Sequence, residues 1–495
     1  MTLGTLILMI GVAAVLLTAA TAWGLGKRDN LLVSFLQHFC GSLFIFSGWV
    51  KAVDPLGTAY KMEQYFAEFQ ATFSDTAASF MAPLFPWLAS YANGFSVFMI
   101  VLEIVLGLAL ILGAHRKLTA WTFFGIVAFF TFLTGFTFLT GYVPEGVNFF
   151  QFGHWGPYVE TNMKVTDCGC FGDFLKLEPR TSFLKDVFLL VPAIIFLVKS
   201  GSMHQLFSPA IRSGVLGLAT AGLIVYCLSN YVWDIPDADF RPFREGVHIH
   251  DQKMAETEAM QNVEILAYKM TNKESGKVVE IPYEQYLQEY KKYPKEEWDL
   301  EQVKSEPAIE PTKISDFDIS NLQGISVTEE ILTIPGHAYM IVAYDLKTQT
   351  SYETTMVPDT TFRIDTLTQG DSTAIVQVVD HIGEQEVRRE TYAWPKKYLT
   401  KWTERVVPVI EQARQEGAEV YVLTKYAPAE MLADFQKEIG IDIPFYVGDD
   451  ILLKTIVRSN PGIVLLEDGT IIKKWHYRKL PTYEKIRAQF AQSVE

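Results

Sequence analysis

Apolar residues are distributed unevenly along the chain, and the first half contains six long runs in which charged residues are rare. The runs cover residues 3–23, 31–50, 95–113, 118–141, 183–198 and 215–232. A helix needs about 20 predominantly apolar residues to cross the hydrocarbon core of a bilayer. The sequence therefore predicts an α-helical membrane bundle of six spans in residues 1–232, in contact with membrane lipid. The first run could also be a cleaved signal peptide, but no basic segment precedes it, which favours a span.

Basic residues occur in alternate links between these runs. They are Lys27 and Arg28, then Arg116 and Lys117, then Lys199 and Arg212. Because basic links stay in the cytoplasm, the pattern places the N-terminus, residues 51–93, residues 142–182 and everything after residue 232 outside the cytoplasm. The first outer link contains an aromatic stretch at residues 59–73. This stretch is typical of an amphipathic helix lying on the membrane, or of a cap packed over the bundle.

The second half has the pattern of a soluble protein. Residues 263–270 and 277–281 flank a turn and predict a β-hairpin within a strap and linker at 233–313, which also carries a short helix at 283–290. From residue 314 onward, strands alternate with helices, which predicts an α/β domain over 314–495. The expected strands are 338–344, 419–423, 444–447, 462–466 and 471–476, and the expected helices 398–415, 428–439, 451–457 and 481–491. An insertion at about 347–395 predicts an added β-hairpin or small sheet.

Composition and charge exclude several classes of function. The chain of 495 residues has a formal net charge of −15, which argues against a nucleic-acid partner, since such a partner requires a basic surface. The four cysteines are too few for a disulfide scaffold, and none lies beyond Cys227. The histidines of the soluble half lack the close spacing of zinc ligands, so we expect no metal site.

The segment Asp167-Cys-Gly-Cys-Phe-Gly-Asp173 carries the most distinctive chemistry. Gly169 and Gly172 allow a tight turn, because glycine adopts positive φ without a Cβ penalty. A disulfide between Cys168 and Cys170 would close a small, strained ring, and strain makes a disulfide more oxidising. Such a pair could accept electrons from a substrate dithiol. The flanking carboxylates oppose this role, since negative charge raises a thiol pKa, and no lysine or arginine is nearer in sequence than Lys164 and Lys176. The alternative is a structural turn that closes the bundle.

Four other residues of the predicted spans are polar or carry a thiol. Glu103 lies near the middle of the third span, where a carboxylate must face the bundle interior and pair or protonate. It is either a functional group, which could exchange the proton that accompanies thiol oxidation, or a structural hydrogen-bonding partner. His38 is expected to make a satisfied polar contact. Cys40 and Cys227 are expected to behave as small buried hydrophobes.

Two segments resemble known families. Residues 44–57, Phe-Ile-Phe-Ser-Gly-Trp-Val-Lys-Ala-Val-Asp-Pro-Leu-Gly, resemble the opening signature of the DoxX family. The Glu103 helix and the Asp-Cys-Gly-Cys-Phe-Gly turn before Leu184-Lys-Asp-Val187 resemble the related MauE family. The resemblance covers about residues 31–200 and implies a four-helix core in a bacterial inner membrane. It also implies periplasmic thiol–disulfide chemistry linked to a membrane quinone, with Cys168, Cys170 and Glu103 as the candidate catalytic residues.

Residues 314–495 resemble a thioredoxin fold. Asn460-Pro461-Gly462 stands where thioredoxins carry a cis-proline before a core strand, which makes Pro461 a candidate binding residue. The strand at 338–344 is followed by Asp345-Leu-Lys-Thr-Gln349, where thioredoxins carry Cys-x-x-Cys. Without a cysteine this domain cannot exchange thiols. It is therefore a binding platform or a scaffold.

These observations support two hypotheses. The first is a membrane thiol–disulfide oxidoreductase or its accessory subunit. The second is a non-enzymatic, membrane-anchored assembly or interaction protein whose redox-inactive domain holds a periplasmic or membrane protein partner. A transporter is less well supported, because the spans show no repeat pair or broken helices.

Overall fold

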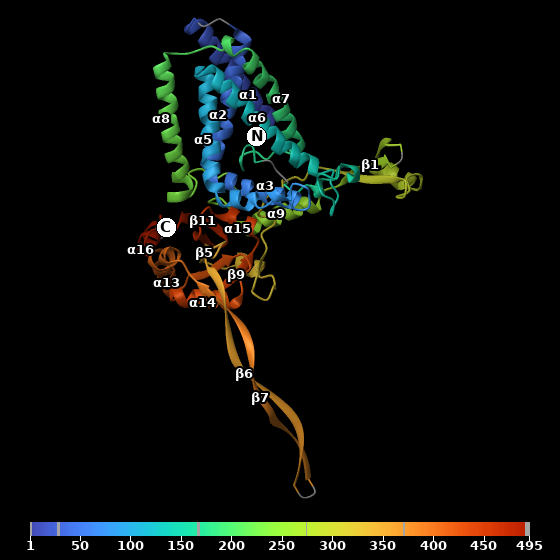
Figure 1. Cartoon of the computed structure of the whole chain (residues 1–495), viewed down its shortest axis with the longest axis vertical. Helices are drawn as coiled ribbons and strands as arrows, with labels where there is room; N and C mark the ends of the chain where they lie inside the picture. The colour runs from blue at the N-terminus through green and yellow to red at the C-terminus, as the bar shows by residue number, and fades with distance from the viewer. Residues whose placement is uncertain (1, 27–29, 166–168, 274, 370–371, 491–495) are drawn as a thin grey trace. The chain divides into compact units, whose positions relative to one another are not determined.

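The computed structural model describes residues 2–26, 30–165, 169–273, 275–369 and 372–490. The chain divides into two compact units, Met1–Arg244 and Glu245–Glu495. The first unit is helical, and the second is rich in strands (Figure 1). This confirms the expected division into a helical bundle followed by an α/β region.

Among the described residues of the first unit, six helices are long and apolar enough to cross a membrane. They are α1 (Leu3–Ala19, extended by a π-turn to Gly24), α2 (Leu31–Val53), α5 (Ala92–Leu112), α6 (Arg116–Thr140), α7 (Pro179–Val198) and α8 (Pro209–Leu228, extended to Trp233). The number of predicted spans is correct, but the last two begin earlier than expected. Both start at a proline, whose fixed φ suits the first helical position, and the Ser208 hydroxyl caps α8.

Glycines allow α2 and α5 to approach closely. A Cβ on Gly107 would lie 2.7 Å from the carbonyl oxygen of Gly41, and a Cβ on Gly41 would lie 2.8 Å from the carbonyl oxygen of Gly107. A Cβ on Gly48 would lie 2.4 Å from Ile104 Cγ1. Small residues of this kind let two membrane helices bring their backbones together. The close contact fixes α5 beside α2, and these two helices carry Glu103 and Lys51.

Two further helices cover part of the bundle. They are α3 (Pro55–Ser74), which starts at a proline behind the N-cap Asp54, and the short α4 (Leu84–Ser90). Tyr65 and Phe69 of α3 are buried in a cluster with Phe85 and Phe136, and the Tyr65 hydroxyl lies 2.8 Å from Thr137 Oγ1. Of the two interpretations of this aromatic stretch, the contacts support the packed cap.

A helix and a three-stranded sheet begin the second unit. The helix α9 (Ile249–Gln261) precedes a sheet of order β2-β1-β3, made of β1 (Ile265–Asn272), β2 (Val278–Pro282) and β3 (Trp298–Lys304), with α10 (Tyr283–Glu289) between β2 and β3. The predicted hairpin and short helix are confirmed. The prediction of a loose linker after that helix was wrong, because β3 pairs along β1. Charged residues hide this strand in the sequence, and Glu301 binds Lys269 of the neighbouring strand at 3.0 Å.

A six-stranded mixed sheet forms the core of the second unit. Its order is β11-β10-β5-β8-β9-β4, where β5, β8 and β9 are parallel and the others antiparallel to their neighbours. The strands are β4 (Ile319–Ser320), β5 (His337–Val342), β8 (Glu419–Thr424), β9 (Phe445–Gly448), β10 (Gly462–Glu467) and β11 (Thr470–His476). The helices are α11 (Thr328–Leu332), α12 (Lys396–Lys401), α13 (Val407–Gln415), α14 (Ala429–Ile439), α15 (Asp450–Ile456) and α16 (Tyr483–Phe490). A π-turn at Trp402–Val406 joins α12 to α13, where the sequence predicted one regular helix.

The predicted insertion forms one long ribbon. Strands β6 (Gln349–Gln369) and β7 (Ser372–Ala393) pair only with each other in an antiparallel two-stranded sheet (Figure 1). A bulge lies beside Phe362. Of the two alternatives from the sequence, a hairpin is correct.

The close packing of α2 and α5 can be tested by substitution. The substitution Gly107→Ala should lower the thermal stability of the purified protein in detergent, because overpacking of this kind costs about 1–3 kcal/mol. Gly125→Ala in α6 is the matched control, since a Cβ there would meet nothing within 4 Å. The control should melt at or above the wild-type temperature, because alanine favours helix. Equal melting temperatures for both variants would contradict the described contact.

Candidate functional site

The C-terminal part of the cysteine-containing turn, from Cys170 onward, packs against the helical bundle. Asp167 and Cys168 lie outside the described residues, whereas Cys170 and the residues that follow it are described. Gly169 and Gly172 have φ values of +60° and +52°, and the Gly172 amide donates to the Gly169 carbonyl at 3.2 Å. The prediction that glycines allow a tight turn here is confirmed.

Three contacts hold this turn. The Ser47 hydroxyl of α2 donates to the backbone carbonyl of Cys170 at 2.8 Å. Phe171 is fully buried in the core of the bundle, 6.3 Å between ring centroids from Phe46. A Cβ on Gly169 would come within 3.2 Å of Lys61 Cγ, so the turn also fits closely against α3. These contacts fix the position of Cys170 relative to α2.

Glu103 forms a buried ion pair. Its Oε2 lies 2.5 Å from the ammonium of Lys51, and both side chains are less than a tenth exposed. The Lys51 ammonium also lies 5.3 Å from the ring centroid of Phe130, a cation–π distance. The prediction that Glu103 faces the interior and pairs is confirmed. Lys51, as its partner, was not predicted, although it lies within the segment that resembles the DoxX signature.

A second ion pair lies at the start of α7. The Lys185 ammonium is 2.5 Å from Oδ1 of Asp186, and the Thr134 hydroxyl of α6 donates to Oδ2 of the same carboxylate at 3.0 Å. Lys185 also lies 5.8 Å from the ring centroid of Phe171. Lys185 and Asp186 were not predicted as site residues. Two adjacent charged residues near the start of an apolar run could have indicated them.

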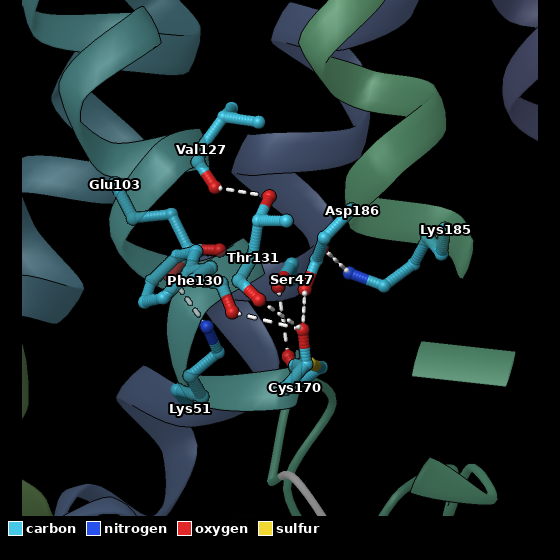
Figure 2. A network of polar contacts seen from close by, with 10 residues as sticks. Ser47, Lys51, Glu103, Val127, Phe130, Thr131, Cys170, Lys185 and Asp186 are labelled. Carbon is cyan, nitrogen blue, oxygen red and sulfur yellow. Dashed lines mark hydrogen bonds and ion pairs between the residues drawn. The ribbon is translucent and has the colours of Figure 1, made fainter. Parts of the chain in front are cut away.

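The two ion pairs lie on either side of Cys170 in the view of Figure 2, and both act on its thiol. Cys170 is partly exposed, and desolvation raises the pKa of its thiol above the ordinary value. Lys185 and Lys51 act to lower that pKa, whereas Asp186 and Glu103 act to raise it. Lys164 and Lys176 are the nearest lysines in the sequence, whereas the lysines that act on the Cys170 thiol come from α2 and α7.

This arrangement can hold a protonated thiol and accept its proton. The Cys170 thiol is protonated at neutral pH, since burial disfavours the thiolate. Two carboxylates and two ammonium groups lie around it, so a proton released on thiol oxidation has nearby acceptors. One helical turn before Asp186, Ser182 is fully buried, and its hydroxyl finds no hydrogen-bonding partner among the described residues. That hydroxyl adds a potential donor on the same face of α7.

The other residues singled out from the sequence have their own surroundings. Cys40 and Cys227 are buried free thiols, as expected. His38 contacts Thr21 Oγ1 at 3.0 Å through Nε2 and stacks on His204 at 4.7 Å between ring centroids. Pro461 belongs to the second unit and follows a cis peptide bond. Within the described ranges, no group of three or more histidine, cysteine or acidic residues could hold a metal ion.

Breaking the Lys51–Glu103 pair should be costly. Lys51→Met or Glu103→Gln alone should destabilise the protein by about 3–5 kcal/mol, because each leaves an uncompensated or poorly paired buried group. The double variant should lose much less than the sum of the single losses. A double-mutant cycle of thermal or denaturant unfolding in one detergent measures this coupling. Additive losses would show that the two side chains do not interact.

The chain was compared with protein-family models, with curated proteins and with solved structures. No family model, curated protein or solved structure matches it.

Proposed function

We propose that this chain is a DoxX/MauE-like bacterial inner-membrane protein that performs or supports thiol–disulfide exchange through Cys168 and Cys170. The observation that carries the proposal is the position of Cys170. Ser47 and the buried Phe171 fix the backbone of Cys170, and two buried ion pairs act on its thiol, which is more than a space-filling residue requires. Buried charges in membrane helices are costly and are usually associated with function.

The proposed reaction balances in two steps. A substrate dithiol reduces the Cys168–Cys170 disulfide, so that the substrate gains a disulfide and the two cysteines become thiols. A membrane quinone then takes two electrons and two protons from these thiols, which restores the disulfide and yields a quinol. The carboxylates of Asp186 and Glu103 are the candidate proton acceptors, because both act electrostatically on the Cys170 thiol.

Membrane location and orientation are part of the proposal. Six apolar helices support residence in a bilayer, where a quinone dissolves. The basic links support an orientation with the Cys168–Cys170 turn outside the cytoplasm, where disulfides persist. We also propose a thioredoxin-like fold for the second unit. Its strand order β11-β10-β5-β8 supports this assignment.

The redox state of the two cysteines in intact membranes tests the main proposal. In a Cys40→Ser/Cys227→Ser background, acid quenching followed by alkylation in denaturant should trap Cys168 and Cys170 mostly as the disulfide. In cells depleted of quinone, the pair should accumulate mostly as thiols, because no electron acceptor remains. A redox state that does not respond to quinone would contradict the electron-relay function.

The ribbon supports a second candidate function, a non-enzymatic binding platform. An isolated two-stranded hairpin is marginally stable in water, and within the described residues neither edge of β6–β7 pairs with another strand. Its distal part exposes several apolar side chains, among which Phe362 lies directly opposite Val379. The exposed set is Phe362, Ile364, Ile375, Val378, Val379 and Ile382. An extended segment of a periplasmic or membrane protein could pair with this ribbon by adding a strand.

Genetic rescue distinguishes the two functions. In a strain that lacks the chain, Cys168→Ser/Cys170→Ser should fail to restore the wild-type phenotype if the thiol chemistry is the function. A ribbon-shortened variant, with residues 353–389 replaced by Asn-Gly, should then restore it. The opposite pattern would support the binding platform. Immunoblots of membranes must show equal amounts of both variants.

A further inference from the structure

Several polar groups converge at one edge of the six-stranded sheet. Asp345 follows β5, Lys425 follows β8, and the cis peptide bond between Asn460 and Pro461 precedes β10. The side-chain amide of Asn460 donates to the backbone carbonyl of Asp345 at 2.6 Å, which joins two of these segments. Ligands of open α/β sheets commonly bind outside the carboxyl ends of parallel strands. We therefore expect a ligand of the second unit to bind at this edge.

Lys401 of α12 lies at the centre of this edge. Its ammonium donates to the carbonyl oxygen of Asn460 at 3.0 Å. It also lies 4.6 Å from the ring centroid of Tyr477 and 5.4 Å from that of Tyr398. The side chain is only partly exposed, so the two aromatic rings and the backbone replace much of its water.

The charges around Lys401 are unbalanced. Within the described residues no carboxylate forms an ion pair with it, and the nearby carboxylate of Asp345 already binds Lys347 and Lys425, the latter at 2.8 Å. The groups acting on Lys401 are the cations of Arg478, Lys347 and Lys397. Burial, together with these cations, lowers the pKa of Lys401 to about 8. His476 adds no charge at neutral pH, because burial and the cations of Arg478 and Lys401 lower its pKa to about 4.

A buried hydroxyl lies beside this cation. Tyr398 is 3% exposed, and its ring centroid lies 5.4 Å from the Lys401 ammonium. The Trp402 indole N–H and the charge of Asp345 both act on the Tyr398 hydroxyl. The proton of this hydroxyl has no acceptor among the described residues. Leaving a buried donor unpaired is costly, so an acceptor that reaches this edge gains a hydrogen bond from Tyr398.

We propose that Lys401 and the Tyr398 hydroxyl bind an oxyanion, a carboxylate or a phosphate group, at this edge of the sheet. An ammonium without a counter-ion attracts a negative group, and the Tyr398 hydroxyl donates to one of its oxygens. The excess of cations around Asp345 adds long-range attraction. This site does not involve Cys168 or Cys170, so its failure would leave the thiol proposal untouched.

Lysine NMR on the full-length protein in detergent tests the site. Reductive methylation with ¹³C-formaldehyde labels the amines and preserves their charge, and the Lys401→Arg variant identifies the Lys401 signal by its absence. The pKa of Lys401 is then titrated at constant ionic strength in chloride, in chloride with acetate, and in chloride with inorganic phosphate. We expect a value of about 8 in chloride and a saturable rise with a binding anion, since the anion stabilises the charged amine.

The response of the Lys401 pKa to each anion identifies the chemical class of the ligand. A rise with phosphate alone supports a phosphate ester, a rise with acetate alone supports a carboxylate, and a rise with both supports a general oxyanion site. Binding should weaken as the pH rises above about 8, because the free amine loses its charge. A Lys401 pKa that neither anion changes would overturn the proposal. Lys437, exposed on α14, is the control and should respond to neither anion.

The substitution Tyr398→Phe removes the hydroxyl and retains the aromatic ring, so it tests whether the hydroxyl binds the anion. Removal of the hydroxyl leaves the packing of the aromatic side chain, so folding should be preserved. The affinity for the anion should fall by about tenfold, the effect of a lost hydrogen bond to a charged group. Unchanged affinity in this variant would exclude the hydroxyl as a ligand and overturn the proposed geometry.

Discussion

The burial of charge inside an apolar bundle is the constraint on which the first unit depends. An ammonium and a carboxylate are each costly in such surroundings, and they become tolerable only when paired at close range. The Lys51–Glu103 and Lys185–Asp186 pairs satisfy this requirement. The Lys51–Glu103 pair joins α2 to α5, and the Thr134 hydroxyl that donates to Asp186 joins α6 to α7, so the relative positions of these helices are restricted. The glycine contacts between α2 and α5 make the first pair possible at all.

The same buried charges affect the pKa of the Cys170 thiol in the cysteine-containing turn. Desolvation raises the pKa of the partly exposed Cys170 thiol, Lys185 and Lys51 act against this rise, and Asp186 and Glu103 add to it. The second unit has no cysteine, and its distinctive chemistry is instead a partly buried amine without a counter-ion and a long ribbon with apolar side chains. The two units therefore carry different kinds of chemistry.

Much of the fold could be predicted because local patterns dominate it. Six apolar runs and alternating strands and helices depend on the burial of near neighbours, and those elements are present at almost the expected residues. The strand β3 escaped prediction because charged residues across the sheet stabilise it, as in the Lys269–Glu301 pair. The extent of the β6–β7 ribbon was also hidden, since its strands contain polar residues on both faces and pair only with each other.

The sequence by itself determined the number of spans, the glycines of the turn and the need for Glu103 to find a partner. Each follows from a local cost: unpaired backbone in lipid, a Cβ at positive φ, or an isolated carboxylate in an apolar helix. Only the tertiary structure decided that Lys51 is the partner, that Lys185 and Asp186 approach Cys170, and that Lys401 lies beside Asn460. These contacts join residues that are distant along the chain. Their pairing depends on how helices and strands pack, which no local pattern encodes.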